Sequence, residues 1–200
     1  MKLYYAPQAC SMAPHIVLRE LGLPFVLIRV DNSTKQTATG DDFLAINPKG
    51  YVAALQLDDG QVLTEGPAIL QYLADLRPEL NLAPANGTFE RVRLQEWLNF
   101  VSTEIHGGLG WLFNPQFPDE VKTQIKAKLF KRFVVLSQTL ARQDYLMAEG
   151  FSVVDAYLFT VLRWTSVFGI DLNQWPALAG FQARVEARPA VKAALAAELA

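Results

Sequence analysis

The single cysteine of this 200-residue chain, Cys10, lies between a strand-like run, 2–5, and a helix-like run, 13–21. A thiol at the start of a helix meets unpaired amides and the positive end of the helix dipole, which lower the thiol pKa. The position three residues on is Ala13, so the chain has no C-x-x-C pair and no internal disulfide. Cys10 could hold, activate or be capped by a small thiol, or it could be a small buried apolar side chain. Its neighbour Ser11 could offer a hydroxyl to a bound sulfur or cap the helix.

Two further segments suit a ligand with amino-acid and peptide groups. In the run 63–69, LTEGPAI, a strand ends, a helix begins, and Glu65 stands at the joint. Free amides at such a joint can bind a carboxylate, and the glutamate can take an ammonium group or merely complement the helix dipole. The run 51–54 leads into a strand and could offer backbone N–H and C=O groups to an extended ligand, or simply begin that strand.

A helix predicted over residues 89–109 carries an uncharged polar stripe opposite its apolar one. The apolar residues at helical spacing, which predict a buried face, are Leu94, Trp97, Leu98, Val101 and Ile105. The polar stripe consists of Asn99, Thr103 and His106. The histidine could donate to a thiolate or accept from a thiol, and the alternative is an exposed polar face. The chain's two histidines have no cluster of Cys or acids around them, so we predict no metal site.

Composition narrows the class of protein. Apolar residues make up 51% of the chain and charged residues 19%, as in a folded globular protein. The net charge is −2 and no basic block is present, which argues against nucleic acid as a partner. The N-terminal run MKLYYAPQAC is too short and broken for a signal peptide, and no apolar run approaches the length of a membrane span. We therefore expect a cytoplasmic protein with no membrane partner.

The elements that must position these residues fall into two groups. Strands are expected at 2–5, 25–30, 54–57 and 61–63, and helices at 13–21, 42–46 and 67–76. Gly22 followed by Pro24 marks a helix end, and the sequence Asp58-Asp59-Gly60 predicts a hairpin. This order combines a right-handed parallel crossover with an antiparallel hairpin.

The second group of elements is helical. A Pro- and Asn-containing stretch from residue 77 to Gly87 reads as a linker, after which helical periodicity dominates. We therefore expect an α/β domain over residues 1–80 and an all-α domain over residues 87–200. Within the latter, Ser152 and Asp155 predict a capping box before the run 156–162, which is apolar on nearly every face and predicts a helix buried in the bundle.

Taken together, these motifs resemble those of the glutathione S-transferase superfamily, specifically its bacterial beta class. The resemblance covers essentially the whole chain and rests on MKLYY with ACS, then NPKGYV, LTEGPAI, EWLN, TEIH and SVVDAY. It implies an α/β thioredoxin-like N-terminal domain that binds glutathione. It also implies an all-α C-terminal domain that forms the electrophile site and part of a homodimer interface.

The resemblance also implies roles for individual residues. Those implied to be catalytic are Cys10, His106 and Ser11, with the cysteine beside the glutathione sulfur, where it can form a mixed disulfide. Those implied to bind glutathione in addition are Lys35, Val52, Glu65, Gly66, Asn99, Thr103 and Glu104. Among these, the Val52 backbone pairs with the cysteinyl group, and the Glu65-Gly66 joint holds the γ-glutamyl head. Lys35 lies near the glycyl carboxylate, and the last three border the site, some of them across the dimer interface.

One position departs from the family pattern. The family normally has a cis-proline directly after the Val52-type residue, and this chain has Ala53. We expect a cis-like bend to be retained, because both backbone groups of Val52 must face the ligand.

The activity implied is conjugation of the glutathione thiolate to small hydrophobic electrophiles, a detoxification reaction with glutathione as co-substrate and no prosthetic group. Thiol–disulfide exchange or peroxide reduction through Cys10, and non-catalytic ligand binding, are the alternatives. Trp111, Phe113 and Trp164 could line the electrophile site or pack in the core.

Overall fold

A computed structural model describes residues 1–199 of the chain, in two compact units. The first unit comprises Met1–Ala83 together with residues 188–199, and the second comprises Pro84–Ala187. The sequence predicts one domain over residues 87–200. The last helix, α9 (Pro189–Leu199), instead belongs to the first unit, because it packs along α1 (Met12–Leu21) and buries Val191 and Ala194.

The first unit is built on a mixed four-stranded sheet in the order β2-β1-β3-β4. Its strands are β1 (Lys2–Tyr5), β2 (Val26–Arg29), β3 (Ala54–Gln56) and β4 (Val62–Thr64). The strands β1 and β2 are parallel, and β3 runs antiparallel to both of its neighbours. The predicted crossover and hairpin are therefore confirmed, and they form the thioredoxin-like arrangement of strands and helices.

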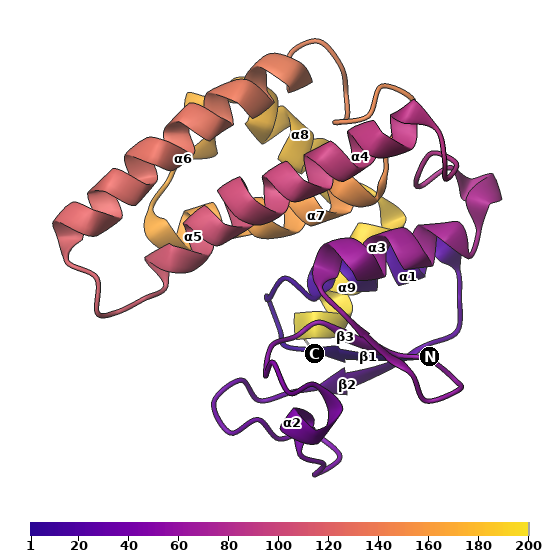
Figure 1. The fold of residues 1–200 in the computed structure, drawn as a ribbon. Coiled ribbons are helices and arrows are strands. Elements are labelled where there is room, and N and C mark those ends of the chain that lie inside the picture. The colour runs from indigo at the N-terminus through magenta and orange to yellow at the C-terminus, as the bar shows by residue number, and fades with distance from the viewer. Residues whose placement is uncertain (200) are drawn as a thin grey trace. The chain divides into compact units, whose positions relative to one another are not determined.

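Alternation of side chains gives the sheet two buried faces. Tyr4 and Ala54 are buried on one face, where Phe43 of α2 (Phe43–Ile46) packs with its ring centroid 5.8 Å from that of Tyr4. Leu3 and Leu55, each next to one of these residues in the sequence, are fully buried and point to the opposite face. The helices α1 and α3 (Gly66–Asp75) pack against each other on that side, with α2 on the other (Figure 1).

The helices of this unit begin and end at residues that favour helix ends. Gly22 closes α1 in the left-handed conformation, with φ 62°, and its N–H donates to the carbonyl of Arg19. Pro67 lies in the first turn of α3, where its missing N–H costs little, and a short 3-10 helix, Pro78–Leu80, follows. The predicted stop at Gly22 is confirmed.

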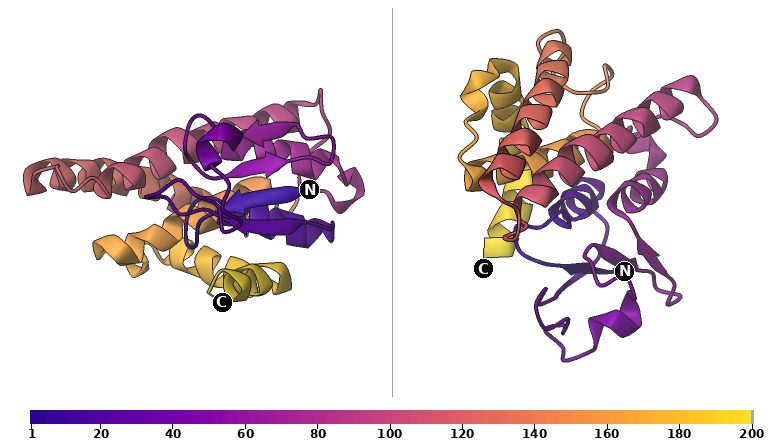
Figure 2. Two further views of the ribbon diagram at one scale, coloured as in Figure 1. Left: turned by 90° about the horizontal axis from the view of Figure 1, so that it is seen from below. Right: turned by 60° about the vertical axis from the view of Figure 1, so that its left-hand side comes forward.

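The second unit is all-helical, and Figure 2 shows its helices from two further directions. They are α4 (Phe89–Phe100), α5 (Gly107–Leu112), α6 (Asp119–Leu140), α7 (Val153–Leu162) and α8 (Pro176–Glu186), with 3-10 segments at Arg163–Phe168 and Leu172–Gln174. All ten residues of α7 are buried, and this helix contacts both α4 and α8. The predicted central helix is confirmed.

Asp155 anchors the start of α7. One carboxylate oxygen accepts from the amide (2.9 Å) and hydroxyl (2.8 Å) of Ser152, and the other accepts from the amide of Leu146 (2.8 Å). The carboxylate is fully buried, so the predicted cap also ties the preceding loop to the helix.

The single helix predicted over 89–109 contains an irregularity. Between α4 and α5, the six residues Val101–His106 are π-helical, and the amide of Gly107 donates to the carbonyl of Ser102. Val101 and Ile105 nevertheless remain fully buried, as predicted. A π-helical segment redirects the side chains that follow it and is often found at functional sites.

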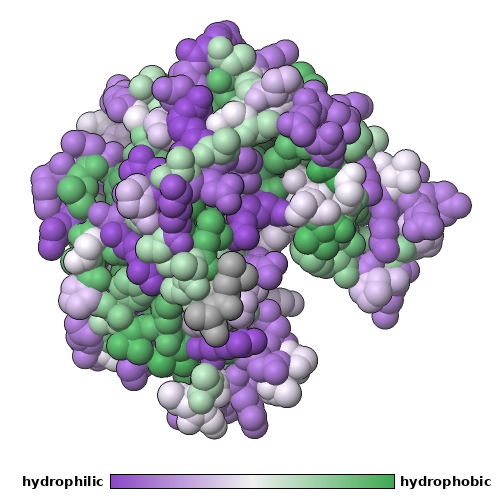
Figure 3. Space-filling view, turned by 180° about the vertical axis from the view of Figure 1, so that it is seen from behind, coloured by the Kyte–Doolittle hydropathy of each residue, from purple (hydrophilic) through white to green (hydrophobic). Residues whose placement is uncertain are grey.

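None of the helices within residues 1–199 has the length and apolar character needed to cross a membrane. Hydrophilic residues are interspersed with hydrophobic ones over the face shown in Figure 3, in keeping with the mixed composition.

Candidate active site

The thiol of Cys10 lies against the backbone that precedes β3. Its Sγ donates to the carbonyl oxygen of Val52 at 3.3 Å. Burial raises the pKa of this thiol to about 11, with a smaller contribution from Glu65, although amides of Cys10, Ser11 and Ala53 act in the opposite direction. The expectation of a lowered pKa is therefore wrong, because loss of water around the sulfur outweighs the amides at the helix start.

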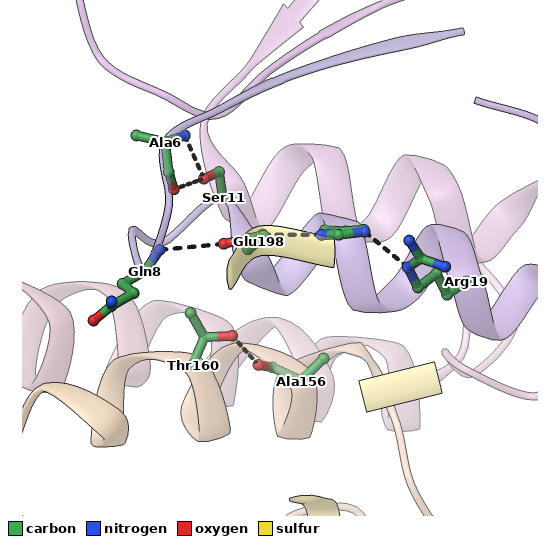
Figure 4. Close-up of polar contacts among 8 residues, drawn as sticks. Ala6, Gln8, Ser11, Arg19, Ala156, Thr160 and Glu198 are labelled. Carbon is green, nitrogen blue, oxygen red and sulfur yellow. Dashed lines mark hydrogen bonds and ion pairs between the residues drawn. The ribbon is translucent and has the colours of Figure 1, made fainter. Parts of the chain in front are cut away.

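Ser11 is fully buried beneath the cysteine and serves the loop that carries it. Its hydroxyl oxygen accepts from the amide of Ala6 and donates to the carbonyl of the same residue, both at 3.2 Å (Figure 4). The predicted helix cap is wrong, since this side chain makes no capping hydrogen bond. The hydroxyl instead closes the turn between β1 and α1.

A buried chain of hydrogen bonds, here called the relay, runs from Glu198 of α9 to the loop between β1 and α1. The amide of Gln8 donates to Oε2 of Glu198 at 3.2 Å, and Oε1 lies 2.9 Å from Nδ1 of His15 (Figure 4). The guanidinium of Arg19 donates from Nε to Nε2 of His15 at 2.8 Å. Because arginine is always a donor, Nε2 must be the accepting nitrogen, and the imidazole is neutral with its proton on Nδ1. The relay fixes the approach to Cys10.

Sequence reasoning missed this relay, because its members lie more than 180 positions apart. One signal was available: Glu198 is the only acid of a helix rich in alanine, in its last turn, where the helix dipole disfavours a negative charge. An acid in such a place needs a partner.

The peptide bond between Val52 and Ala53 is cis, which confirms the expected bend. Both residues are buried, and the side-chain amide of Asn47 donates to the carbonyl of Tyr51 at 2.7 Å. The turn cluster predicted over residues 47–50 thus supports the backbone that faces Cys10.

Glu65 stands at the β4–α3 joint in a backbone conformation that residues other than glycine seldom adopt, with φ 72°. Backbone strain of this kind is characteristic of functional sites. The carboxylate is exposed and pairs with the ammonium group of Lys49 at 2.6 Å, which also donates to the hydroxyl of Thr64 at 3.1 Å. Lys49 was not predicted as a site residue, although it stands in the same turn cluster that precedes Val52.

Lys35 folds back onto the loop on which Lys49 stands. Its ammonium donates to the carbonyl of Gly50 at 2.9 Å and lies 5.7 Å from the centroid of the Tyr51 ring. The first unit therefore gathers a thiol, a backbone edge at Val52, one carboxylate and two ammonium groups around a single loop.

The remaining predicted residues lie in the second unit. Asn99 and Thr103 are exposed, and the threonine hydroxyl donates to the Asn99 carbonyl at 3.0 Å. Glu104 is paired with Arg132 at 2.6 Å and Lys128 at 3.7 Å, and the hydrogen bond from Arg132 lowers the pKa of its carboxyl.

His106 lies among aromatic side chains. Its Nδ1 is 2.5 Å from the hydroxyl of Tyr157, and its ring centroid is 5.1 Å from that of Trp164. Burial lowers the pKa of the imidazole, so the ring is neutral at pH 7. Trp111 and Phe113 are 59% and 50% exposed, so the alternative that both pack in the core is wrong.

Within residues 1–199, no group of three or more His, Cys, Asp or Glu side chains is arranged to hold a metal ion. The first unit presents a half-buried thiol donor, a backbone edge and paired charges, and the second presents an aromatic surface with a neutral histidine.

Comparison with known proteins defines the class. The N-terminal domain model of glutathione S-transferases matches residues 9–76, and the C-terminal domain model matches residues 100–189. The chain belongs to the glutathione S-transferase family.

Individual relatives narrow the relationship. The chain is 45% identical to glutathione S-transferase GstA of Escherichia coli O157:H7, over 99% of this chain and 98% of that protein. It is similar to a beta-class glutathione S-transferase structure from Sphingomonas chungbukensis, with a TM-score of 0.95 and 45% identity over 99% of this chain and 98% of the other. A sphingomonad glutathione S-transferase complexed with glutathione gives a TM-score of 0.96 and 44% identity, with coverage of 99% and 98%. The predicted family, class and fold are confirmed.

Proposed function

We propose that this glutathione S-transferase binds glutathione on its first unit and conjugates it, through its thiolate, to hydrophobic electrophiles. The observation that carries the proposal is the grouping of Cys10, the Val52 backbone and Glu65 around one loop. Each matches one part of glutathione: its thiol, its peptide backbone and its ammonium group. Residues 1–80 are the glutathione-binding domain in this assignment.

The other charged and polar residues complete the proposed site. Lys35 takes the glycyl carboxylate, and the amide of Gly66 contributes to the γ-glutamyl end. Asn99, Thr103, Glu104 and His106 border the site from the helical domain, which also supplies part of a homodimer interface.

Cys10 acts as a hydrogen-bond donor in this mechanism. With a pKa of about 11, its thiol keeps its proton at neutral pH. When the cysteinyl N–H of glutathione pairs with the Val52 carbonyl, the Cys10 S–H is released to donate to the glutathione sulfur. That donation favours the glutathione thiolate, whose proton leaves to solvent. The thiolate then attacks carbon, a C–S bond forms, and the leaving group departs with its electron pair.

His106 supplies a second donor. When the Tyr157 hydroxyl donates to Nδ1, the proton of the neutral imidazole resides on Nε2, which can donate to the thiolate. Ser11 contributes through its amide, because its hydroxyl is engaged by Ala6.

The electrophile site is assigned to the exposed aromatic surface of the helical domain. Trp111 is exposed, and Phe113 packs edge-on against Trp164 with centroids 5.5 Å apart. Flat apolar electrophiles suit such a surface, because aromatic rings stack on or edge against one another.

The raised pKa of Cys10 counts against the redox alternative, because disulfide exchange needs a thiolate. Replacing Cys10 by serine retains a donor of similar reach. We therefore expect Cys10→Ser to retain most conjugation activity while abolishing any disulfide exchange.

The test is calorimetric titration of the full chain with glutathione at neutral pH, followed by conjugation of a nitro-substituted aryl chloride with release of chloride. Saturable binding that Glu65→Gln weakens by about tenfold, the loss of one charge-assisted contact, supports the proposal. No binding at millimolar glutathione contradicts it.

A further inference from the structure

The start of α3 has few amides with which to hold a carboxylate. Pro67 has no N–H, and the amides of Ala68 and Ile69 both donate to the carbonyl of Glu65 at 3.0 Å. Gly66 has no side chain and can contribute only its own amide. The expectation that several free amides at this joint would bind a carboxylate is therefore not met.

The cation closest to this joint is Lys49. Its ammonium lies 2.6 Å from Oε1 of Glu65 and is also held by the Thr64 hydroxyl at 3.1 Å. The two charged side chains are 55% and 65% exposed, so a ligand can reach both. Lys35 is engaged elsewhere on the loop, at the carbonyl of Gly50.

We propose that the Lys49–Glu65 ion pair is the receptor for a zwitterionic α-amino-acid head group, with Lys49 binding the carboxylate while Glu65 binds the ammonium. This assignment rests on the proposed binding of glutathione and makes Lys49 a specificity-determining residue for its γ-glutamyl end.

The balance of positive and negative charges favours this arrangement. A ligand with only an ammonium group would compete with Lys49 for Glu65 and would bring no carboxylate for the lysine. A zwitterion brings a carboxylate that replaces the one Lys49 gives up, so four charges alternate in sign and none is left unpaired. The Thr64 hydroxyl keeps the lysine in place during the exchange.

The experiment compares two ligands by calorimetric titration of the full chain. One is glutathione, and the other is 4-aminobutyryl-cysteinylglycine, which differs only by lacking the α-carboxylate. Lys49→Met is the test variant. Lys49→Arg preserves the charge, and Lys35→Met is a matched control that removes the other ammonium on the same loop.

We expect Lys49→Met to weaken glutathione binding about fivefold, as for one partly exposed charge pair, and not to weaken binding of the analogue, which no longer competes with the lysine for Glu65. Lys49→Arg should stay close to the wild type. Lys35→Met should weaken both ligands alike, because both retain the glycyl carboxylate.

Three outcomes would overturn the inference. Unchanged or tighter glutathione binding by Lys49→Met would show that the lysine does not hold the carboxylate. Equal weakening of both ligands would show that Lys49 only positions Glu65. Absence of glutathione binding by the wild type would instead overturn the proposed function, so the two failures are distinguishable.

Discussion

Alkylation of Cys10 should be slow at neutral pH and should accelerate only in strongly alkaline solution. Burial raises the pKa of this thiol to about 11, and the thiolate is the species that reacts with iodoacetamide. The chain has one cysteine, so the loss of free thiol reports this residue alone.

The expected effect is large. At pH 7 a thiol with a pKa of about 11 is ionised in roughly 1 molecule in 10⁴, whereas a free cysteine with a pKa of about 8.5 is about 3% ionised. The thiolate population is therefore roughly 300-fold smaller than in an unfolded peptide. Because restricted access also slows alkylation, the midpoint of the pH profile is the quantity to compare, not the absolute rate.

The assay follows iodoacetamide labelling by mass spectrometry from pH 6 to pH 11 on native protein, and the rate should still be rising at the upper end of this range. Glu65→Gln is the matched variant, because the nearby negative charge contributes to the raised pKa and its removal should shift the profile to lower pH. A rate that reaches its plateau below pH 8 would refute the reasoning and would show that Cys10 is a reactive thiolate near neutral pH.

The same pKa has a consequence for stability. The unfolded thiol ionises near pH 8.5–9 and the folded one near 11, so the unfolded state binds fewer protons between these values. The contribution of this group to the free energy of unfolding is fully present below pH 8.5 and is lost as the pH rises to about 11, a loss of up to about 3 kcal/mol. A Cys10→Ser variant should lack this alkaline decline, and an equal decline in both proteins would contradict the assignment.

Three further predictions concern the helical unit. Asp155→Ala should lower the free energy of unfolding by about 3 kcal/mol or more, because three buried donors lose their acceptor, and a change below 1 kcal/mol in urea denaturation would count against this. In an NMR titration, His106 should ionise below the ordinary histidine pKa of about 6.5, because burial disfavours its charged form, and a midpoint above that value would be inconsistent with the site. Gly108→Ala should destabilise by about 1 kcal/mol despite better helix propensity, since the added methyl would lie 2.7 Å from a buried Leu129 methyl; a raised melting temperature would disprove the clash.

Local sequence chemistry predicted much of the architecture. The alternation of strands and helices in the first 76 residues, the left-handed helix end at Gly22 and the capping box at Ser152 and Asp155 depend on short-range rules, and all are present. The buried α7 also followed from its composition, because a helix that is apolar on every face has no stable place at a surface.

Features that depend on long-range contacts were not predictable. The pKa of Cys10 depends mainly on how much protein surrounds the sulfur, and this cannot be read from the sequence. The pairing of Lys49 with Glu65 depends on how a loop returns beside the end of β4. The irregularity at Val101–His106 inserts an extra residue into a helical turn without any proline or glycine inside it to mark the place.

The placement of α9 in the first unit affects how the protein can be made. A ribosome delivers the sheet early, but Glu198, the partner of His15, is added only after the entire helical unit. Until the helical unit has been synthesised, the nascent N-terminal unit therefore has a histidine without its acid partner and an α1 without the helix that packs along it. Truncations or fusions that disturb the last helical turn should impair the loop bearing Cys10, although the altered residues lie nearly 190 positions away from it in the sequence.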